Sequence, residues 1–98
     1  MRAQCQCGQL TADLPERALI TIACHCIACQ RRTGAPFGVL AYYRCDQINV
    51  KGDTKSYKRI SAENNAVEAF FCPICGSTVY LKLGKQPGEF GHEVMKLR

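Results

Sequence analysis

Seven of the eight cysteines in this chain of 98 residues stand near another cysteine, in three short clusters. Thiolate sulfur is a preferred ligand of Zn²⁺, and closely spaced cysteines let one segment of backbone deliver several sulfurs to one point. One such pair is a weak signal, but three clusters in so short a chain indicate metal binding. The middle cluster, in "CHCIAC", supplies three sulfurs, whereas a closed tetrahedral zinc site needs four ligands. The clusters are Cys5 and Cys7; Cys24, Cys26 and Cys29; and Cys72 and Cys75.

The cellular compartment decides between metal sites and disulfides in a chain so rich in cysteine. The N-terminal "MRAQCQCGQL" holds no apolar run of signal-peptide length, and no stretch approaches the length of a membrane span. We therefore expect a cytoplasmic, reduced protein with no membrane partner. In that setting clustered cysteines are more often metal ligands or redox groups than structural disulfides. Bound metal would also support a core that, at this size, is only marginally stable.

The segments that must position these cysteines are predicted to be mostly strands. In "QLTADL" (9–14), Leu10, Ala12 and Leu14 share one face, which predicts a half-buried strand. The run "ALITIAC" (18–24) is almost wholly apolar and rich in β-branched residues, which predicts a buried strand that ends at the middle cluster. Further strands are expected at 37–43, 66–72 and 77–83, and two more within 48–60 about a turn at Gly52–Asp53.

Two short segments are predicted to turn sharply. In "CPICGS" (72–77), Pro73 fixes φ, and Gly76 can adopt the positive φ that lets the backbone fold back. The segment at 29–35 allows one short helical turn. No segment has the apolar periodicity of a long helix, and there is no repeat or low-complexity linker, so we expect a single domain.

The two pairs of cysteines separated by one residue are expected to bring their sulfurs together through an extended segment, not through a turn. Alternate side chains of an extended segment share a face. Cys5 should therefore point the same way as Cys7, and Cys24 the same way as Cys26. The intervening residues, such as His25, would then point away.

Four motifs follow one another along the chain: "CQCG" (5–8), "CHCIACQRRTGAPF" (24–37), "SYKR" (56–59) and "FFCPICGS" (70–77). In this order and spacing they resemble the glutathione-dependent formaldehyde-activating enzyme (GFA) family. The resemblance implies a mostly β fold of small antiparallel sheets pinned by zinc, the β-tent that the family shares with zinc-binding chaperones of Rab GTPases. It implies one GFA-like domain over residues 1–98, with two Zn²⁺ ions per chain.

The resemblance also divides the cysteines between a structural site with four ligands and an open site with three. The fourth position of the open site would take water or a substrate sulfur, as catalytic zinc keeps one position free. The structural site falls on Cys5, Cys7, Cys72 and Cys75, and the open site on Cys24, Cys26 and Cys29.

The reaction that the resemblance implies is that of a zinc-dependent carbon-sulfur lyase. A thiol such as glutathione would add to formaldehyde or a related aldehyde, giving an S-hydroxymethyl thioether, or the reverse. Zinc lowers the pKa of a coordinated thiol and so makes the nucleophile. Three thiolate ligands make zinc a poorer Lewis acid than three histidines would, which favours holding a sulfur over hydrolysis.

The candidate catalytic residues are the three cysteines of the open site and His25, a possible proton carrier. The alternative for His25 is a hydrogen bond behind the ligands. Arg31 and Arg32 would bind a substrate carboxylate or offset the charge of the zinc-thiolate centre. Lys58 and Arg59 are further candidates for the carboxylate.

The chain departs from the family pattern in three places. Gln30 stands where a basic residue is usual, and "VEAFFC" lacks an arginine often found before the last cysteine pair. The family usually runs on through further strands, whereas only residues 84–98 follow Leu83. We expect part of the pocket wall to be short, and a homodimer could supply it.

The same residues are compatible with two other functions. A non-catalytic zinc domain could act through a protein partner, and Cys45 could then close the open site as a fourth ligand. Nucleic-acid binding is suggested by the formal net charge of +5. However, seven metal-bound thiolates remove seven charges and two Zn²⁺ ions add four, which lowers the net charge to +2. The basic residues also form no run, so we expect no nucleic-acid partner.

Overall fold

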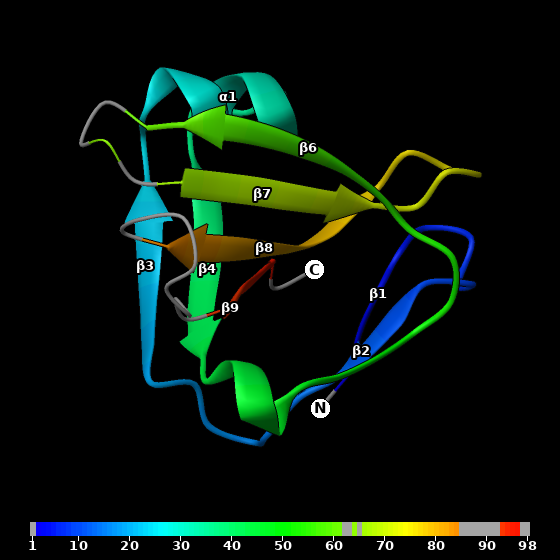
Figure 1. Ribbon diagram of the computed structural model, residues 1–98. Helices are drawn as coiled ribbons and strands as arrows, with labels where there is room; N and C mark the ends of the chain where they lie inside the picture. The colour runs from blue at the N-terminus through cyan, green and yellow to red at the C-terminus, as the bar shows by residue number, and fades with distance from the viewer. Residues whose placement is uncertain (1, 62–63, 65, 85–92, 97–98) are drawn as a thin grey trace.

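The computed structural model describes residues 2–61, 64, 66–84 and 93–96, and of residues 45 and 93–96 it describes the backbone only. Over these residues the chain forms two antiparallel β-sheets, one short α-helix and one 3₁₀ turn (Figure 1). The expected fold, mostly β in small antiparallel sheets, is confirmed. Within the same ranges no helix has both the length and the apolar character needed to cross a membrane.

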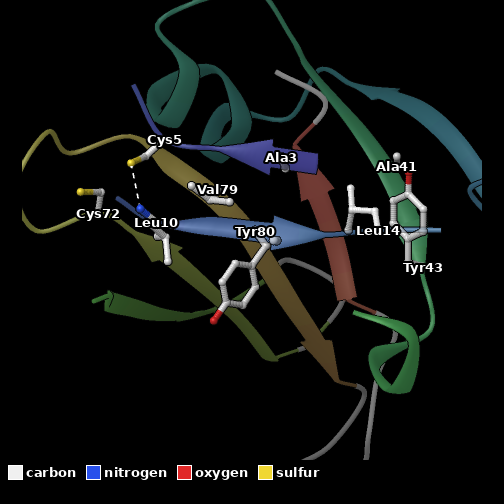
Figure 2. Close-up of a cluster of buried hydrophobic side chains, with 10 residues drawn as sticks. Ala3, Cys5, Leu10, Leu14, Ala41, Tyr43, Cys72, Val79 and Tyr80 are labelled. Carbon is white, nitrogen blue, oxygen red and sulfur yellow. Dashed lines mark hydrogen bonds between the residues drawn. The ribbon is translucent and has the colours of Figure 1, made fainter. Parts of the chain in front are cut away.

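The smaller sheet carries the alternation predicted for residues 9–14. Leu10, Ala12 and Leu14 are all buried, with exposed fractions of 7% or less. They belong to a core cluster that lies between the two sheets and includes Tyr43 and Val79 (Figure 2). The strands, in spatial order, are β1 (Arg2–Gln4), β2 (Thr11–Asp13) and β5 (Asn49–Lys51).

The larger sheet has the spatial order β3-β4-β9-β8-β7-β6, and its first two strands run across the direction of its last three (Figure 1). A strand at residues 93–96 was not expected, and it joins the two halves of the sheet. The strands are β3 (Ile20–Cys24), β4 (Gly38–Tyr43), β6 (Lys55–Ile60), β7 (Ala66–Phe71), β8 (Thr78–Gly84) and β9 (Glu93–Lys96).

The prediction that residues 18–24 form a buried strand is half wrong. The strand exists as β3, but Leu19 and Ile20 are 58% and 56% exposed. Among the described strands β3 lies at the edge of the sheet and pairs with β4 alone, so apolar side chains there need not be covered. A continuous apolar run does not reveal whether a strand lies at the centre or the edge of a sheet.

The two strands predicted about the turn at Gly52–Asp53 lie in different sheets. Both strands form, but β5 pairs with β2 in the smaller sheet and β6 pairs with β7 in the larger one. The turn therefore carries the chain from one sheet to the other. Gly52 has φ +108°, and a Cβ there would overlap the carbonyl oxygen of Gln9. The glycine is needed for close approach of two backbones rather than for a hairpin.

Candidate metal centres

The first group of converging cysteines brings together a pair near the N-terminus and a pair 65 residues later in the chain. The four Sγ atoms lie within 4.8 Å of one another, close enough to hold one metal ion. Cys7 is 3.6 Å from Cys5 and 3.7 Å from Cys72. One pair follows β1 and the other lies between β7 and β8, so the group ties the smaller sheet to the larger. Its members are Cys5, Cys7, Cys72 and Cys75.

The N-terminal pair converges by a turn, not by the extended geometry that we expected. The N–H of Cys5 donates to the carbonyl of Leu10 (3.0 Å), and the N–H of Gly8 to the carbonyl of Cys5 (3.1 Å). The N–H of Leu10 donates back to Sγ of Cys5 at 3.3 Å, as Figure 2 shows. The backbone thus wraps around the sulfur.

The second pair sits in the predicted turn, and Gly76 adopts the expected positive φ, +80°. Sγ of Cys72 accepts hydrogen bonds from the N–H groups of Ile74 (3.3 Å) and Cys75 (3.5 Å). It also accepts from Nε2 of Gln9 at 3.0 Å. Donors aimed at a sulfur favour its thiolate form, which is the form that binds metal.

The electrostatics of Cys75 point the same way. The hydroxyl of Ser77 lies 3.4 Å from Sγ of Cys75. Hydrogen bonds from this hydroxyl and from the Ser77 N–H lower the pKa of Cys75 from 9.0 to about 5. Neither Ser77 nor Gln9 was identified as functional from the sequence, although both lie within two residues of a cysteine pair.

The second group of cysteines forms where β3 gives way to the helix α1 (Ile27–Thr33), over the ends of β3 and β4 (Figure 1). The Sγ atoms of Cys24, Cys26 and Cys29 lie within 4.8 Å of one another. Cys24 ends the strand, and Cys26 is the N-cap of α1. Its Sγ accepts the N–H of Cys29 at 3.4 Å. The predicted short helical turn is confirmed and begins two residues earlier than expected.

This three-cysteine group has a buried side and an open side. Cys29 belongs to the second core cluster and is 5% exposed, whereas Cys26 is exposed. Burial raises the pKa of Cys29 to about 11, and the hydrogen bond from the N–H of Cys29 lowers the pKa of Cys26. The charge of Arg59, on β6, also lowers the pKa of Cys26.

The other predicted site residues are distributed around this group. His25 is exposed, and its ring centroid lies 5.2 Å from that of Phe37. Its carbonyl accepts a hydrogen bond from Nε2 of Gln30 at 2.8 Å. No hydrogen bond to the His25 ring is found in the described part of the chain. Arg31 is exposed, whereas Arg32 is partly buried beside Cys29.

The alternative fourth ligand, Cys45, begins the 3₁₀ turn η1 (Cys45–Gln47). Its backbone follows the end of β4 that pairs with Ile20, whereas Cys24 pairs with Gly38 at the other end. Five residues of strand span roughly 17 Å. The side chain of Cys45 lies outside what the structure describes, but the backbone position does not support a shared ion.

Both groups suit zinc by their chemistry. Thiolates select Zn²⁺ among the common hard and borderline cations, and both a four-cysteine and a three-ligand set occur in zinc sites. The backbone N–H groups directed at Sγ of Cys5, Cys26 and Cys72, and the side-chain amide of Gln9 directed at Cys72, fit a set of thiolates. The fold and sites together define a small β protein with two potential metal centres.

The chain matches the family model described as "Glutathione-dependent formaldehyde-activating enzyme" over residues 1–95, and it belongs to that family. Among solved structures, the crystal structure of a Rhodobacter sphaeroides protein matches with a TM-score of 0.72. The match covers 99% of this chain and 84% of that one at 18% identity, so it shows a shared fold alone. A comparison with curated proteins found no match.

Proposed function

We propose that this chain is a carbon-sulfur lyase of the GFA type, which joins a small thiol such as glutathione to formaldehyde or a related aldehyde, or catalyses the reverse. Family membership supports the reaction class. The observation that carries the proposal is the three-cysteine group with one exposed flank at Cys26. Such a set fits a metal centre that keeps a position for a substrate sulfur.

Zn²⁺ bound there would hold the substrate thiol as a thiolate at neutral pH. The substrate sulfur would then form a bond to the aldehyde carbon as the C=O π bond breaks, and the oxygen would take up the proton that the thiol had lost, giving the S-hydroxymethyl product. His25, exposed beside the group, would carry that proton. The free thiols and the substrate both suit the reducing cytoplasm.

Basic side chains on the exposed side of the group would bind the carboxylates of the thiol. Arg31 is exposed on the last turn of α1, and Arg59 is close enough to affect Cys26. Guanidinium groups bind carboxylates through two parallel hydrogen bonds. A homodimer would add further wall to the site.

Formaldehyde and glutathione also combine without an enzyme, so the test must measure a rate above this background. Nuclear magnetic resonance exchange spectroscopy of ¹³C-formaldehyde with glutathione gives that rate. The zinc-loaded protein should accelerate exchange between free and thiol-bound formaldehyde, and Cys26→Ser should abolish the acceleration without unfolding the chain. The proposal fails if the loaded wild-type protein leaves the exchange rate at its uncatalysed value.

A non-catalytic zinc domain with a protein partner is the second candidate, and one observation favours it. Ile27, Phe37 and Val39, which flank the three-cysteine group in the chain, are 64%, 41% and 38% exposed. Exposed apolar side chains that gather near a site can mark a protein interface. An inactive protein that still binds two zinc ions would support this candidate.

A further inference from the structure

The guanidinium of Arg32 is buried in an unusual way. Its two terminal nitrogens, Nη1 and Nη2, are inaccessible to solvent and have no hydrogen-bond partner among the residues that the structure describes. Arginine is rarely buried unless it is paired, because an unpaired buried charge is costly. The positive charge of Arg32 is therefore buried without a hydrogen bond from either terminal nitrogen to the described residues.

Gly38 shows where this guanidinium lies. A Cβ at residue 38 would stand 2.8 Å from Nη2 of Arg32 and 3.6 Å from Cβ of Cys29. Gly38 also pairs with Cys24 across β3 and β4. The guanidinium thus occupies the space between α1 and β4, on the inner side of the three-cysteine group. Gly38 has no positive φ, so space rather than backbone conformation is what the glycine provides.

The charge of the loaded centre matches this arrangement. Three thiolates and one Zn²⁺ carry a net charge of −1, which one guanidinium neutralises. Hydrogen bonds between an ionised acceptor and a guanidinium are about twice as strong as neutral ones. A partner that orients and stabilises a metal ligand typically raises metal affinity about 10- to 100-fold.

We propose that Arg32 is an internal counter-ion of the three-cysteine metal centre, donating to its thiolates from the buried side, and that Gly38 keeps the space that this requires. The inference rests on the proposed occupancy of that centre. It gives the two neighbouring arginines different tasks. Arg32 positions the ligands and balances their charge, whereas Arg31, exposed to solvent, is free to contact a substrate.

The experiment measures metal affinity at each site of the full chain. ¹¹³Cd resonance spectroscopy separates four-sulfur from three-sulfur coordination, and competition with a chelator gives the affinity of each. Arg32→Met, which keeps an unbranched stem but removes the guanidinium and its charge, should weaken the three-cysteine site about 10-fold or more. Gly38→Ala should weaken it by displacing the guanidinium, Arg32→Lys should retain most of the affinity, and the exposed control Arg31→Met should stay within about two-fold.

The comparison of wild type with Arg32→Met distinguishes failure of the inference from failure of the proposed function. If the wild type binds two ions and Arg32→Met binds the second as tightly, the counter-ion role is wrong and the proposed function stands. If the wild type binds only one ion, both fail. Should Arg32→Met lose the four-cysteine signal through unfolding, the comparison of Gly38→Ala with Arg31→Met decides, and equal affinities overturn the inference.

A second measurement distinguishes a counter-ion from a substrate anchor. The binding of two thiols is compared with cobalt at the three-cysteine site: glutathione, which carries carboxylates, and cysteamine, which carries none. A counter-ion role predicts that Arg32→Met changes the apparent affinities of the two thiols by the same factor. Selective weakening of glutathione alone would show that Arg32 binds the substrate carboxylate, which contradicts the proposal.

Discussion

Gln9 shows how one side chain can connect a turn to a metal centre. Its amide accepts the N–H of Asp53 at 3.0 Å, and its Nε2 donates to the carbonyl of Asp53 at 2.8 Å and to Sγ of Cys72 at 3.0 Å. It therefore holds the crossing between the sheets against the four-cysteine group. In the sequence it is one more polar residue after a CxCG motif, because its two partner residues lie 44 and 63 positions away.

Ser77 gives a prediction at the same scale. Ser77→Ala removes the hydroxyl that is the largest cause of the lowered pKa of Cys75, so that pKa should rise from about 5 toward 9.0. A metal ligand must be deprotonated to bind, so the stabilised thiolate contributes at high pH and is lost as the pH falls through the folded pKa. In the variant this loss starts at higher pH.

The measurement is acid titration of the zinc-loaded protein with a fluorescent zinc indicator. The pH of half-release from the four-cysteine site should be higher for Ser77→Ala than for the wild type. Ser56→Ala is the control, because that exposed hydroxyl bonds to Glu68 on β7 at 2.7 Å. Identical release curves for Ser77→Ala and the wild type would remove Ser77 from the site.

At the scale of elements, the sequence predicted the existence of strands better than their neighbours. The alternation of Leu10, Ala12 and Leu14 named the buried face of β2 correctly, because period-two burial is a local property. The exposure of β3 and the separation of β5 from β6 depend on which strand lies alongside, and that is set by contacts far apart in the chain. β9 was missed because the four residues of "EVMK" are too few for a pattern.

The Gly52 crossing gives a prediction at this scale. Gly52→Ala places a Cβ on the carbonyl of Gln9 and within 2.9 Å of Cα of Leu10, at φ +108°. Gly34→Ala is the matched control, because Gly34 also has positive φ, +69°, but no atom lies within 4 Å of its added Cβ. The control should cost only the backbone strain of about 1–2 kcal/mol, and Gly52→Ala should cost clearly more.

Chemical denaturation of the zinc-loaded variants measures both free energies of unfolding. If Gly52→Ala loses no more stability than Gly34→Ala, the backbones of residues 9–10 and 52 do not approach as closely as the structure shows.

At the scale of the whole molecule, each cysteine group belongs to one of the two cores. Cys5 and Cys72 lie in the cluster between the sheets, and Cys29 lies in the cluster of Leu40, Val67 and Leu81. The family resemblance, which rests on the order of the cysteine motifs, predicted the division into two cysteine groups. No local sequence pattern could predict where the second core lies. From the sequence, Arg31 and Arg32 had the same candidate roles beside the metal centre, because nothing in "QRRTG" shows which of the two guanidinium groups is buried.

This organisation predicts different roles for the two metals in stability. Metal at the four-cysteine group closes a loop of 65 residues between Cys7 and Cys72, which restricts the unfolded chain strongly. Metal at the other group closes only a short stretch. Structural zinc binding contributes on the order of 10 kcal/mol, comparable with the stability of a whole small domain. Cys72→Ser should therefore unfold the chain and lose both metals, whereas Cys26→Ser should remain folded with one.

Thermal melting and zinc content, measured on both variants in parallel, test this division. A folded Cys72→Ser protein alongside an unfolded Cys26→Ser protein would mean that the structural and open sites are the reverse of our assignment.

The central claim is that the three-cysteine group holds a metal with a position open to a thiol. Cobalt substitution tests it most directly, because the absorption bands of Co²⁺ report the number of bound sulfurs. With two Co²⁺ per chain, millimolar glutathione should change the bands of the three-cysteine site and leave those of the four-cysteine site unaltered. Uptake of only one Co²⁺ per chain, or two sets of bands that do not respond to glutathione or to any other thiol, would contradict the claim.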